Sequence, residues 1–267
     1  MMIEILEETS SAELEALRLE ALATLDAPMD GMWEAFALGA VPREIRWQGK
    51  RAGFFFVDDE GLILQFYVTP AYAQSRRDIF QAVLDRDEVR GAMVSTGDSD
   101  FLALCQKHQT SSEDHTLLYG DQHLVSIETP GGFETSLKVV EAGELDAIAK
   151  LQRESLDQDL GDWLLGYLAN LIARRELHAL RRQETVIATG EIRVSDSQKP
   201  YGDLGVITMR PHRGQGAAAY LLSQLKQRCH ERGLLPICST TTDNIAAQKA
   251  IEKAGFVPRH RMLRVAF

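Results

Sequence analysis

The sequence predicts an α/β protein (an α+β arrangement around a mixed sheet) whose architecture is built twice, in tandem. Both halves run through the same order of elements: helices, a strand hairpin, a strand followed by a helix, a second strand and helix, and a closing strand. Between the halves lies Thr129-Pro130-Gly131-Gly132, which has the composition of a linker. We therefore expect two domains, residues 1–130 and 134–267.

In the first half, Ser10 and Glu13 have the spacing of a capping box, and the apolar residues that follow recur at helical spacing until Pro28. The acidic turn at residues 58–61 separates two apolar runs, as in a hairpin. Besides the helix between Ser10 and Pro28, the pattern predicts a short helix or turn at residues 32–38, helices at residues 79–84 and 98–106, and strands at residues 51–57, 62–68, 92–94, 117–119 and 124–127.

The second half repeats this order. Asp162 is of the residue type that caps helix N-termini, and Arg174 and Arg175 lie where positive charge favours a last turn. The pattern predicts helices at residues 144–156 and 163–175 and strands at residues 137–140, 178–182, 186–194, 204–209 and 262–267.

Length and composition limit the class of protein to which the chain can belong. The 267 residues are enough for two domains, and 45% hydrophobic with 25% charged residues is typical of soluble globular proteins. We expect no membrane span, because no run approaches the roughly 18 apolar residues required. The three cysteines have no metal-ligand spacing and the N-terminus has no basic signal region, so we expect a metal-free protein of the reducing cytoplasm.

The most informative stretch follows the apolar run at residues 204–209. It reads Arg210-Pro211-His212-Arg213-Gly214-Gln215-Gly216-Ala217-Ala218 and leads into a helix that Gly233 ends. Small residues let the backbone approach an anion, and the free amides of the first helical turn point at it. A P-loop would need a Lys that is absent here, and a dinucleotide fingerprint would need an acidic residue about 20 positions on. The loop therefore predicts a phosphate site of another kind.

The charge distribution fits a small polyanion. The net charge is −10, yet residues 210–267 hold 10 of the 29 Lys and Arg and only 3 of the 39 Asp and Glu. A locally basic block in an acidic protein suits a phosphorylated cofactor better than a nucleic acid, which the acidic surface would repel.

These motifs resemble the GNAT acyltransferase superfamily over roughly residues 135–267. The family's loop reads Gln/Arg-x-x-Gly-x-Gly/Ala, and Arg213, Gly216 and Ala218 are in register with it. Its next block reads Asn-x-x-Ala/Ser, then an aromatic or apolar position, then Gly-Phe. The matching residues are Asn244, Ala247, Ile251, Gly255 and Phe256.

The resemblance implies a twisted mixed sheet that binds acetyl-CoA or another acyl-CoA as co-substrate. Pantetheine would follow the strand residues and the pyrophosphate would lie on the loop, with two residues of the next helix on the cofactor side. The residues so implied are Val206, Ile207, Thr208 and Met209, then Arg213, Gly214, Gln215, Gly216, Ala217 and Ala218, then Asn244 and Ala247. In the first half, residues 68–75 align with this loop but contain no Gly, so we expect a degenerate GNAT-like domain there.

Acyl transfer to an amine requires a base, an oxyanion donor and an acid for the leaving thiolate. Glu191 and Asp203, on neighbouring predicted strands, are the candidate bases. Many members of the family carry a tyrosine acid where this chain has Ile251, which leaves Tyr220, Ser239 or solvent for that role.

We therefore expect an N-acetyltransferase acting on a small-molecule or peptide amine by direct attack. The acceptor is not encoded in a recognisable pattern, and no nucleic-acid or membrane partner is expected. The alternative is a non-catalytic acyl-CoA-binding regulator, which Ile251 motivates. A third reading, an interaction module with a silent site, is disfavoured by the intact loop.

Overall fold

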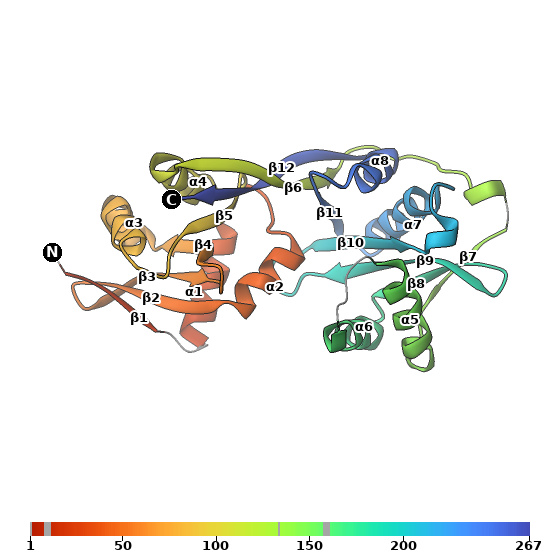
Figure 1. Ribbon diagram of the computed structural model, residues 1–267, viewed down its shortest axis with the longest axis horizontal. Coiled ribbons are helices and arrows are strands. Elements are labelled where there is room, and N and C mark those ends of the chain that lie inside the picture. Colours follow the sequence, from red (N-terminus) through yellow and green to blue (C-terminus); the bar gives the residue numbers. More distant parts are fainter. Residues whose placement is uncertain (1, 8–11, 133, 157–160) are drawn as a thin grey trace. The chain divides into compact units, whose positions relative to one another are not determined.

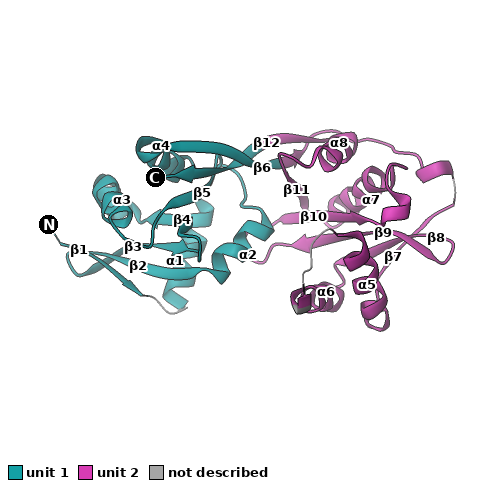
Figure 2. Cartoon of the chain, in the orientation of Figure 1, with its two compact units in different colours: residues 1–118, 260–267 teal, residues 119–259 magenta. Residues whose placement is uncertain are grey.

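The structure, a computed structural model, describes residues 2–7, 12–132, 134–156 and 161–267 (Figure 1). The chain divides into two compact units, residues 1–118 with 260–267 (unit 1) and residues 119–259 (unit 2) (Figure 2). These differ from the predicted domains 1–130 and 134–267, because the last residues of the chain pair with a strand of the first unit. Among the described residues, no helix has the length and apolar character needed to cross a bilayer.

Unit 1 is a mixed sheet with helices on both faces. Its strand order is β1-β2-β3-β4-β5-β12, and only β4 and β5 within this order pair in parallel. The elements are β1 (Ile3–Glu7), α1 (Ala12–Ala23), α2 (Gly31–Gly39), β2 (Val41–Trp47), β3 (Lys50–Val57), β4 (Leu62–Val68), the 3₁₀ turn η1 (Pro70–Ser75), α3 (Arg76–Leu84), β5 (Gly91–Ser95) and α4 (Ser99–His108). Two further strands, β6 (Ser111–Asp121) and β12 (Phe256–Ala266), have residues in both units.

Both faces of β3 from Ala52 onward and of β4 are buried, which explains why these segments are apolar except for Gln65. Phe55 and Phe66 belong to a core that includes Phe80 of α3, whereas Phe54 packs with residues of α1. The predicted capping residue Ser10 lies outside the described part of the chain.

One predicted hairpin is wrong. Residues 117–119 and 124–127 do not form two strands, because residues 111–121 form the single strand β6 and no strand follows before residue 130. The turn signal at Gly120 and Asp121 is overridden by tertiary contacts: the amides of Gln122 and His123 donate to the carbonyl oxygen of Gly255.

Unit 2 repeats the plan with the strand order β11-β10-β9-β8-β7. Its elements are η2 (Pro130–Gly132), β7 (Ser136–Val139), η3 (Ala142–Glu144), α5 (Leu145–Ser155), α6 (Gly161–Ala173), β8 (Leu177–Arg182), β9 (Thr185–Val194), β10 (Tyr201–Thr208), η4 (Arg210–His212), α7 (Ala217–Glu231), β11 (Leu235–Thr241) and α8 (Ile245–Lys253). The predicted mixed α/β architecture is confirmed in both units.

The two faces of the unit 2 sheet carry different helices. On one face Gly190 of β9 meets Leu221 and Leu225 of α7. On the other, Gln152 of α5 donates to the Thr189 hydroxyl over 2.9 Å. Because successive strand residues point to opposite faces, Glu191 and Arg193 lie on the α5 and α6 side.

The parallel strands of each unit separate after a short paired segment. β10 and β11 are in register only from Tyr201 to Asp203, and β4 and β5 only at Leu62 and Ile63. β10 stays paired with β9 on its other edge as far as Thr208. The residues of β10 after Asp203 therefore run away from β11 toward the glycine loop.

Candidate active site

The glycine loop lies where β10 gives way to α7. Gly214 and Gly216 have φ values of +75° and +85°, which L-residues with a side chain rarely adopt. A Cβ atom added at either position would have no heavy atom within 4 Å. Glycine is thus required here by the backbone conformation, and the space beside both residues is open.

The first turn of α7 is suited to an anion. Gly216 is the N-cap residue and has no side chain to bind the first amides, and no acidic residue lies in the first turn. The amides at the start of an α-helix have no partner within the helix, and the helix dipole places partial positive charge there. Ala217 and Ala218 add only methyl groups at this helix end, so a phosphate can approach closely.

Arg213 and Gln215 bind within the protein. The Arg213 guanidinium donates to the carbonyl oxygens of Ser155 and Thr208, which ties the loop to the end of α5. Gln215 donates to the carbonyl oxygen of Pro211 over 3.1 Å. The exposed Arg213 therefore contributes positive charge near the loop, but its hydrogen bonds fix the loop rather than reach out from it.

The strand before the loop carries a buried threonine hydroxyl, that of Thr208, for which the described residues supply no hydrogen bond. Val206, Ile207 and Thr208 are half-buried, and Met209 is buried with its amide donating to Ile187. The buried Thr208 Oγ1 has no hydrogen-bond partner among the described residues. Such atoms are uncommon, and a ligand along β10 is one source of the missing bond.

Asn244 has a clear structural role. It is the N-cap of α8, and its side chain accepts a hydrogen bond from the half-buried Ala247 amide over 3.2 Å. Further along α8, Ile251 is 5% exposed and packs inward, so it supplies no group for proton transfer. Ser239 lies half-buried on β11, and Tyr220 lies half-buried in the first turns of α7.

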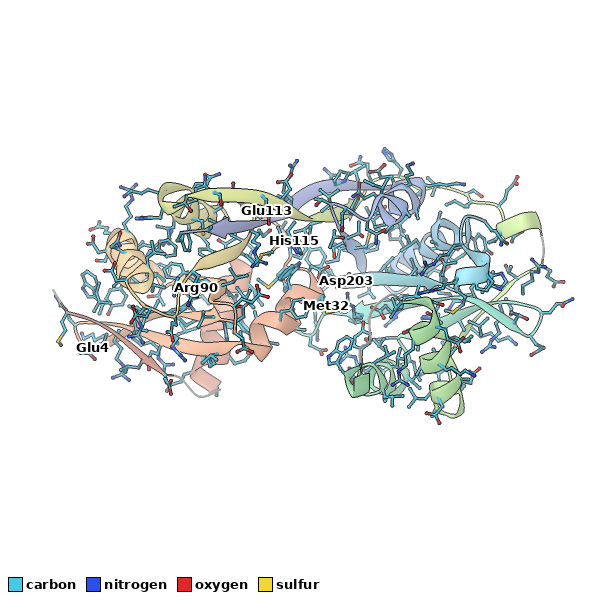
Figure 3. The ribbon with its side chains drawn as sticks, viewed as in Figure 1. Glu4, Met32, Arg90, Glu113, His115 and Asp203 are labelled. Atoms are coloured by element: carbon cyan, nitrogen blue, oxygen red, sulfur yellow. The ribbon has the colours of Figure 1, made fainter. Side chains whose placement is uncertain are left out.

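Glu191 and Asp203, alternatives at the level of sequence, belong to one network in the structure. Arg193 lies between them, with its Nε atom 3.2 Å from Glu191 and a terminal nitrogen 2.6 Å from Asp203. Asp203, labelled in Figure 3, projects from β10 and is almost completely buried. The Glu191 side chain is 15% exposed and is the more accessible carboxylate.

Tyr167 joins this network and was missed in the sequence analysis. Its hydroxyl donates to Glu191 over 2.5 Å, and burial together with the Glu191 charge raises the pKa of the phenol above its ordinary value. The phenol therefore stays protonated and donates. The one available signal was Trp163, four residues earlier on the same helical face.

A glycine in β10 makes room for the Glu191 carboxylate. Gly205 is the cross-strand partner of Glu191, and a Cβ atom there would lie 2.7 Å from Glu191 Oε1. The carboxylate therefore lies flat against β10, on the segment that separates from β11.

The corresponding region of unit 1 has different chemistry. The connection from β4 to α3 is η1, which contains no glycine. Asp98 is the N-cap of α4, and burial raises the pKa of its carboxyl to about 6. Asp100 pairs with Arg76 over 2.6 Å, and the cavity between these residues measures about 20 Å³, enough for about one water molecule.

No metal site competes with this interpretation. Within the described ranges, no group of three or more His, Cys, Asp or Glu side chains is arranged to hold a metal ion.

In the comparison with known proteins, each half of the chain matches an acetyltransferase family model. One family model, described as an acetyltransferase (GNAT) domain, matches residues 10–122, and another, described as the acetyltransferase (GNAT) family, matches residues 144–256. The predicted tandem arrangement is confirmed. The prediction of a degenerate first half is corrected, because that half matches a GNAT family model of its own; its glycine-free loop had suggested otherwise.

Solved structures of GNAT proteins match the chain over almost its whole length. A GNAT-family acetyltransferase from Colwellia psychrerythraea is 30% identical over 99% of both chains, with a TM-score of 0.92. A GCN5-related N-acetyltransferase from Sphaerobacter thermophilus is 18% identical over 98% of this chain and 95% of that one, with a TM-score of 0.64. A tandem GNAT protein from the clavulanic acid biosynthesis pathway is 14% identical over 99% and 98%, with a TM-score of 0.61. The last two likenesses show the fold alone, and no curated protein matched.

Proposed function

Because the chain belongs to the GNAT acetyltransferase family, we propose that it is an N-acyltransferase that transfers an acetyl group from acetyl-CoA to an amine. The observation that carries this proposal is the glycine loop at the start of α7. Gly214 and Gly216 hold the conformation that only glycine adopts easily, and the space beside them is open.

We place the acyl-CoA site in unit 2. The pyrophosphate fits the open loop and the first amides of α7, and the orphaned Thr208 hydroxyl offers a hydrogen bond along the strand. Unit 1 differs at both corresponding places, because η1 lacks glycine and the helix after β5 begins with the carboxyl groups Asp98 and Asp100. Carboxylates at that position repel a polyanion.

The reaction forms a bond between the amine nitrogen and the acyl carbon and breaks the bond between that carbon and the CoA sulfur. A backbone N–H of β10, between Val206 and Met209, is our candidate donor to the developing oxyanion. Glu191 is our candidate to accept the ammonium proton, directly or through water, because it is the more accessible of the two carboxylates. Asp203 then holds Arg193 in place.

The leaving thiolate needs a proton from elsewhere. Ile251 is buried and apolar, so we assign this proton to solvent, with Ser239 or Tyr220 as the side chains to test. A thiolate is stable enough to leave before it is protonated, since even a cysteine thiol has an ordinary pKa of only about 8.5, so solvent can supply the proton afterwards.

The test has two parts, both on the full chain. Acetyl-CoA should raise the melting temperature, and a panel of amines should release CoA thiol from acetyl-CoA. Glu191→Gln should lower kcat and weaken its dependence on pH, whereas the loss of a binding contact alone would mainly raise KM. Stabilisation without thiol release for any amine would favour the second candidate, an acyl-CoA-binding regulator, which the buried Ile251 motivates.

A further inference from the structure

Two aromatic rings are stacked on the exposed side of α6. Trp163 and Tyr167 are one helical turn apart, with ring centroids 4.8 Å apart and planes inclined by only 11°. Tyr167 is half-buried, whereas Trp163 is 52% exposed. We call this pair the aromatic ledge. An indole that is stacked on one side and open on the other is available to a ligand.

A hydrogen bond to the sheet holds the aromatic ledge in position. The Tyr167 hydroxyl donates to Glu191 over 2.5 Å, and Glu191 lies against Gly205 of β10. A continuous chain of contacts therefore runs from the indole ring through the phenol and the carboxylate to the strand segment that separates from β11. A rigid aromatic surface loses little conformational entropy on binding, which favours recognition.

The chemistry of the ledge suits a cation. The face of an indole attracts ammonium and guanidinium groups more strongly than other aromatic side chains do. Beside it lie the carboxylates of Glu191 and Asp203, both of which contact the guanidinium of Arg193. Arg153 also lies on this side, but it is exposed and donates to the Gly161 carbonyl, so solvent screens its charge. The net charge of −10 adds long-range attraction for cations.

We propose, building on the proposed function, that the aromatic ledge selects acceptors that carry a second cationic group besides the amine that is acetylated. One ammonium group approaches Glu191 and is the nucleophile after it loses its proton. The other lies over the open face of Trp163. Diamines and polyamines are the substrate class that this arrangement favours, and amines with a carboxylate near the nitrogen are disfavoured.

The test measures binding independently of turnover. Calorimetric titrations use the full chain saturated with CoA and three probes of equal chain length: 1,5-diaminopentane, pentylamine and 5-aminopentanoate. We expect the diamine to bind at least about fivefold more tightly than pentylamine, and 5-aminopentanoate to bind most weakly. Trp163→Leu should weaken diamine binding by about 5- to 30-fold and change pentylamine binding by less than about twofold.

Phe36→Leu is the matched control. Phe36 is 48% exposed and lies on α2, the helix of unit 1 that corresponds in order to α6. This variant loses an exposed aromatic ring outside the ledge and should bind all three probes as the wild type does. Trp163→Phe, which keeps an aromatic face, should retain most of the wild-type preference for the diamine over pentylamine.

The outcomes separate the two proposals. If CoA stabilises the wild type but the diamine is not preferred, or is bound equally by Trp163→Leu, the ledge proposal is overturned and the cofactor site stands. If no probe binds the CoA complex, the ledge proposal is overturned as well. If CoA itself fails to bind, the proposed function is wrong. Stabilisation of each variant by CoA confirms that it is folded.

Discussion

Replacing Gly216 with glutamate separates the ligand role of the glycine loop from its structural role. Gly216 is the N-cap of α7, and Gly233 follows the other end of the same helix. Both residues have positive φ, +85° and +69°, and neither has a neighbour within 4 Å of an added Cβ. Gly233→Glu is therefore a matched control, with the same backbone strain and the same side chain at the opposite helix end.

The expected stability changes follow from the backbone and the helix dipole. A side chain at positive φ costs about 1–2 kcal/mol in either variant. A carboxylate at the start of a helix recovers about 0.3–1 kcal/mol, and one at the end loses a similar amount. We therefore expect Gly216→Glu to be the more stable variant, with a melting temperature a few degrees below that of the wild type.

For CoA affinity we expect the opposite ranking, with Gly233→Glu binding more tightly than Gly216→Glu. A carboxylate about 4 Å from the pyrophosphate repels it by about 1–4 kcal/mol, depending on solvent screening, which is about 5- to 1000-fold in affinity. CoA at about 100 times its dissociation constant stabilises the wild type by about 2.7 kcal/mol, or about 5–11 °C. Gly233→Glu should keep that shift, whereas Gly216→Glu should show a smaller one at the same CoA concentration: about two thirds of it after a fivefold loss of affinity and almost none after a 1000-fold loss.

The assay is a thermal melt of the three proteins with and without CoA, with circular dichroism to confirm folding. An unchanged CoA shift in a folded Gly216→Glu variant would refute the assignment of the loop. Loss of the shift in both variants would show that distortion of α7, and not charge at its N-terminus, controls binding.

Three further predictions concern single residues. Gly205→Ala should displace the Glu191 carboxylate and lower kcat by up to about 100-fold while CoA stabilisation and folding persist, as steady-state kinetics and melts can check. Asn244→Asp keeps an equally good N-cap but adds a negative charge, so melts should show unchanged stability and calorimetry a weaker CoA affinity if Asn244 faces the cofactor. Because the folded-state pKa of Asp98 is raised to about 6 from 3.8, its stabilising contribution is complete below pH 3.8 and is lost as the pH rises through 6. Asp98→Asn should therefore be more stable than the wild type above pH 6, with the difference vanishing near pH 4, in urea unfolding followed against pH.

The glycine loop was predictable because its signals are local. The loop sequence itself contains the glycines at positive φ, and Gly233 marks the end of α7 as the sequence analysis expected; Asn244, at the start of α8, is of a residue type that caps helices. Backbone conformations that only glycine adopts, and N-caps, are encoded by single residues. No long-range contact had to be known.

The strand β2 was missed because charged residues form part of its buried surface. Arg43 and Glu44 of β2 are buried, and the spacing of apolar residues therefore does not reveal the strand. Arg43 pairs with Glu88 over 2.9 Å, and Glu44 pairs with Arg51 over 2.9 Å. Ion pairs with residues on other elements, seven and 45 positions away in the sequence, make these charges tolerable in the core, and the apolar pattern of a single sequence does not reveal such pairing.

The network around Glu191 was only partly predictable for the same reason. Side chains two positions apart share a face of a strand, so the sequence of β9 alone is enough to put Glu191 and Arg193 on one face. Tyr167 lies 24 residues earlier, on a different element, and its hydroxyl meets Glu191 only after α6 has packed on the sheet. The role of Gly205 likewise depends on its cross-strand partner, Glu191, which the sequence alone does not identify.

The two units share a backbone plan and differ in a few residues at the loop and the helix cap. Each unit separates its parallel strands after a short paired segment and begins the next helix with an N-cap side chain. In unit 2 this cap is the neutral Asn244, and in unit 1 it is the buried carboxyl Asp98. The strand geometry is common to both units and does not distinguish them. The loop glycines and the charge of the helix cap differ, and they are the features that a polyanionic cofactor would distinguish.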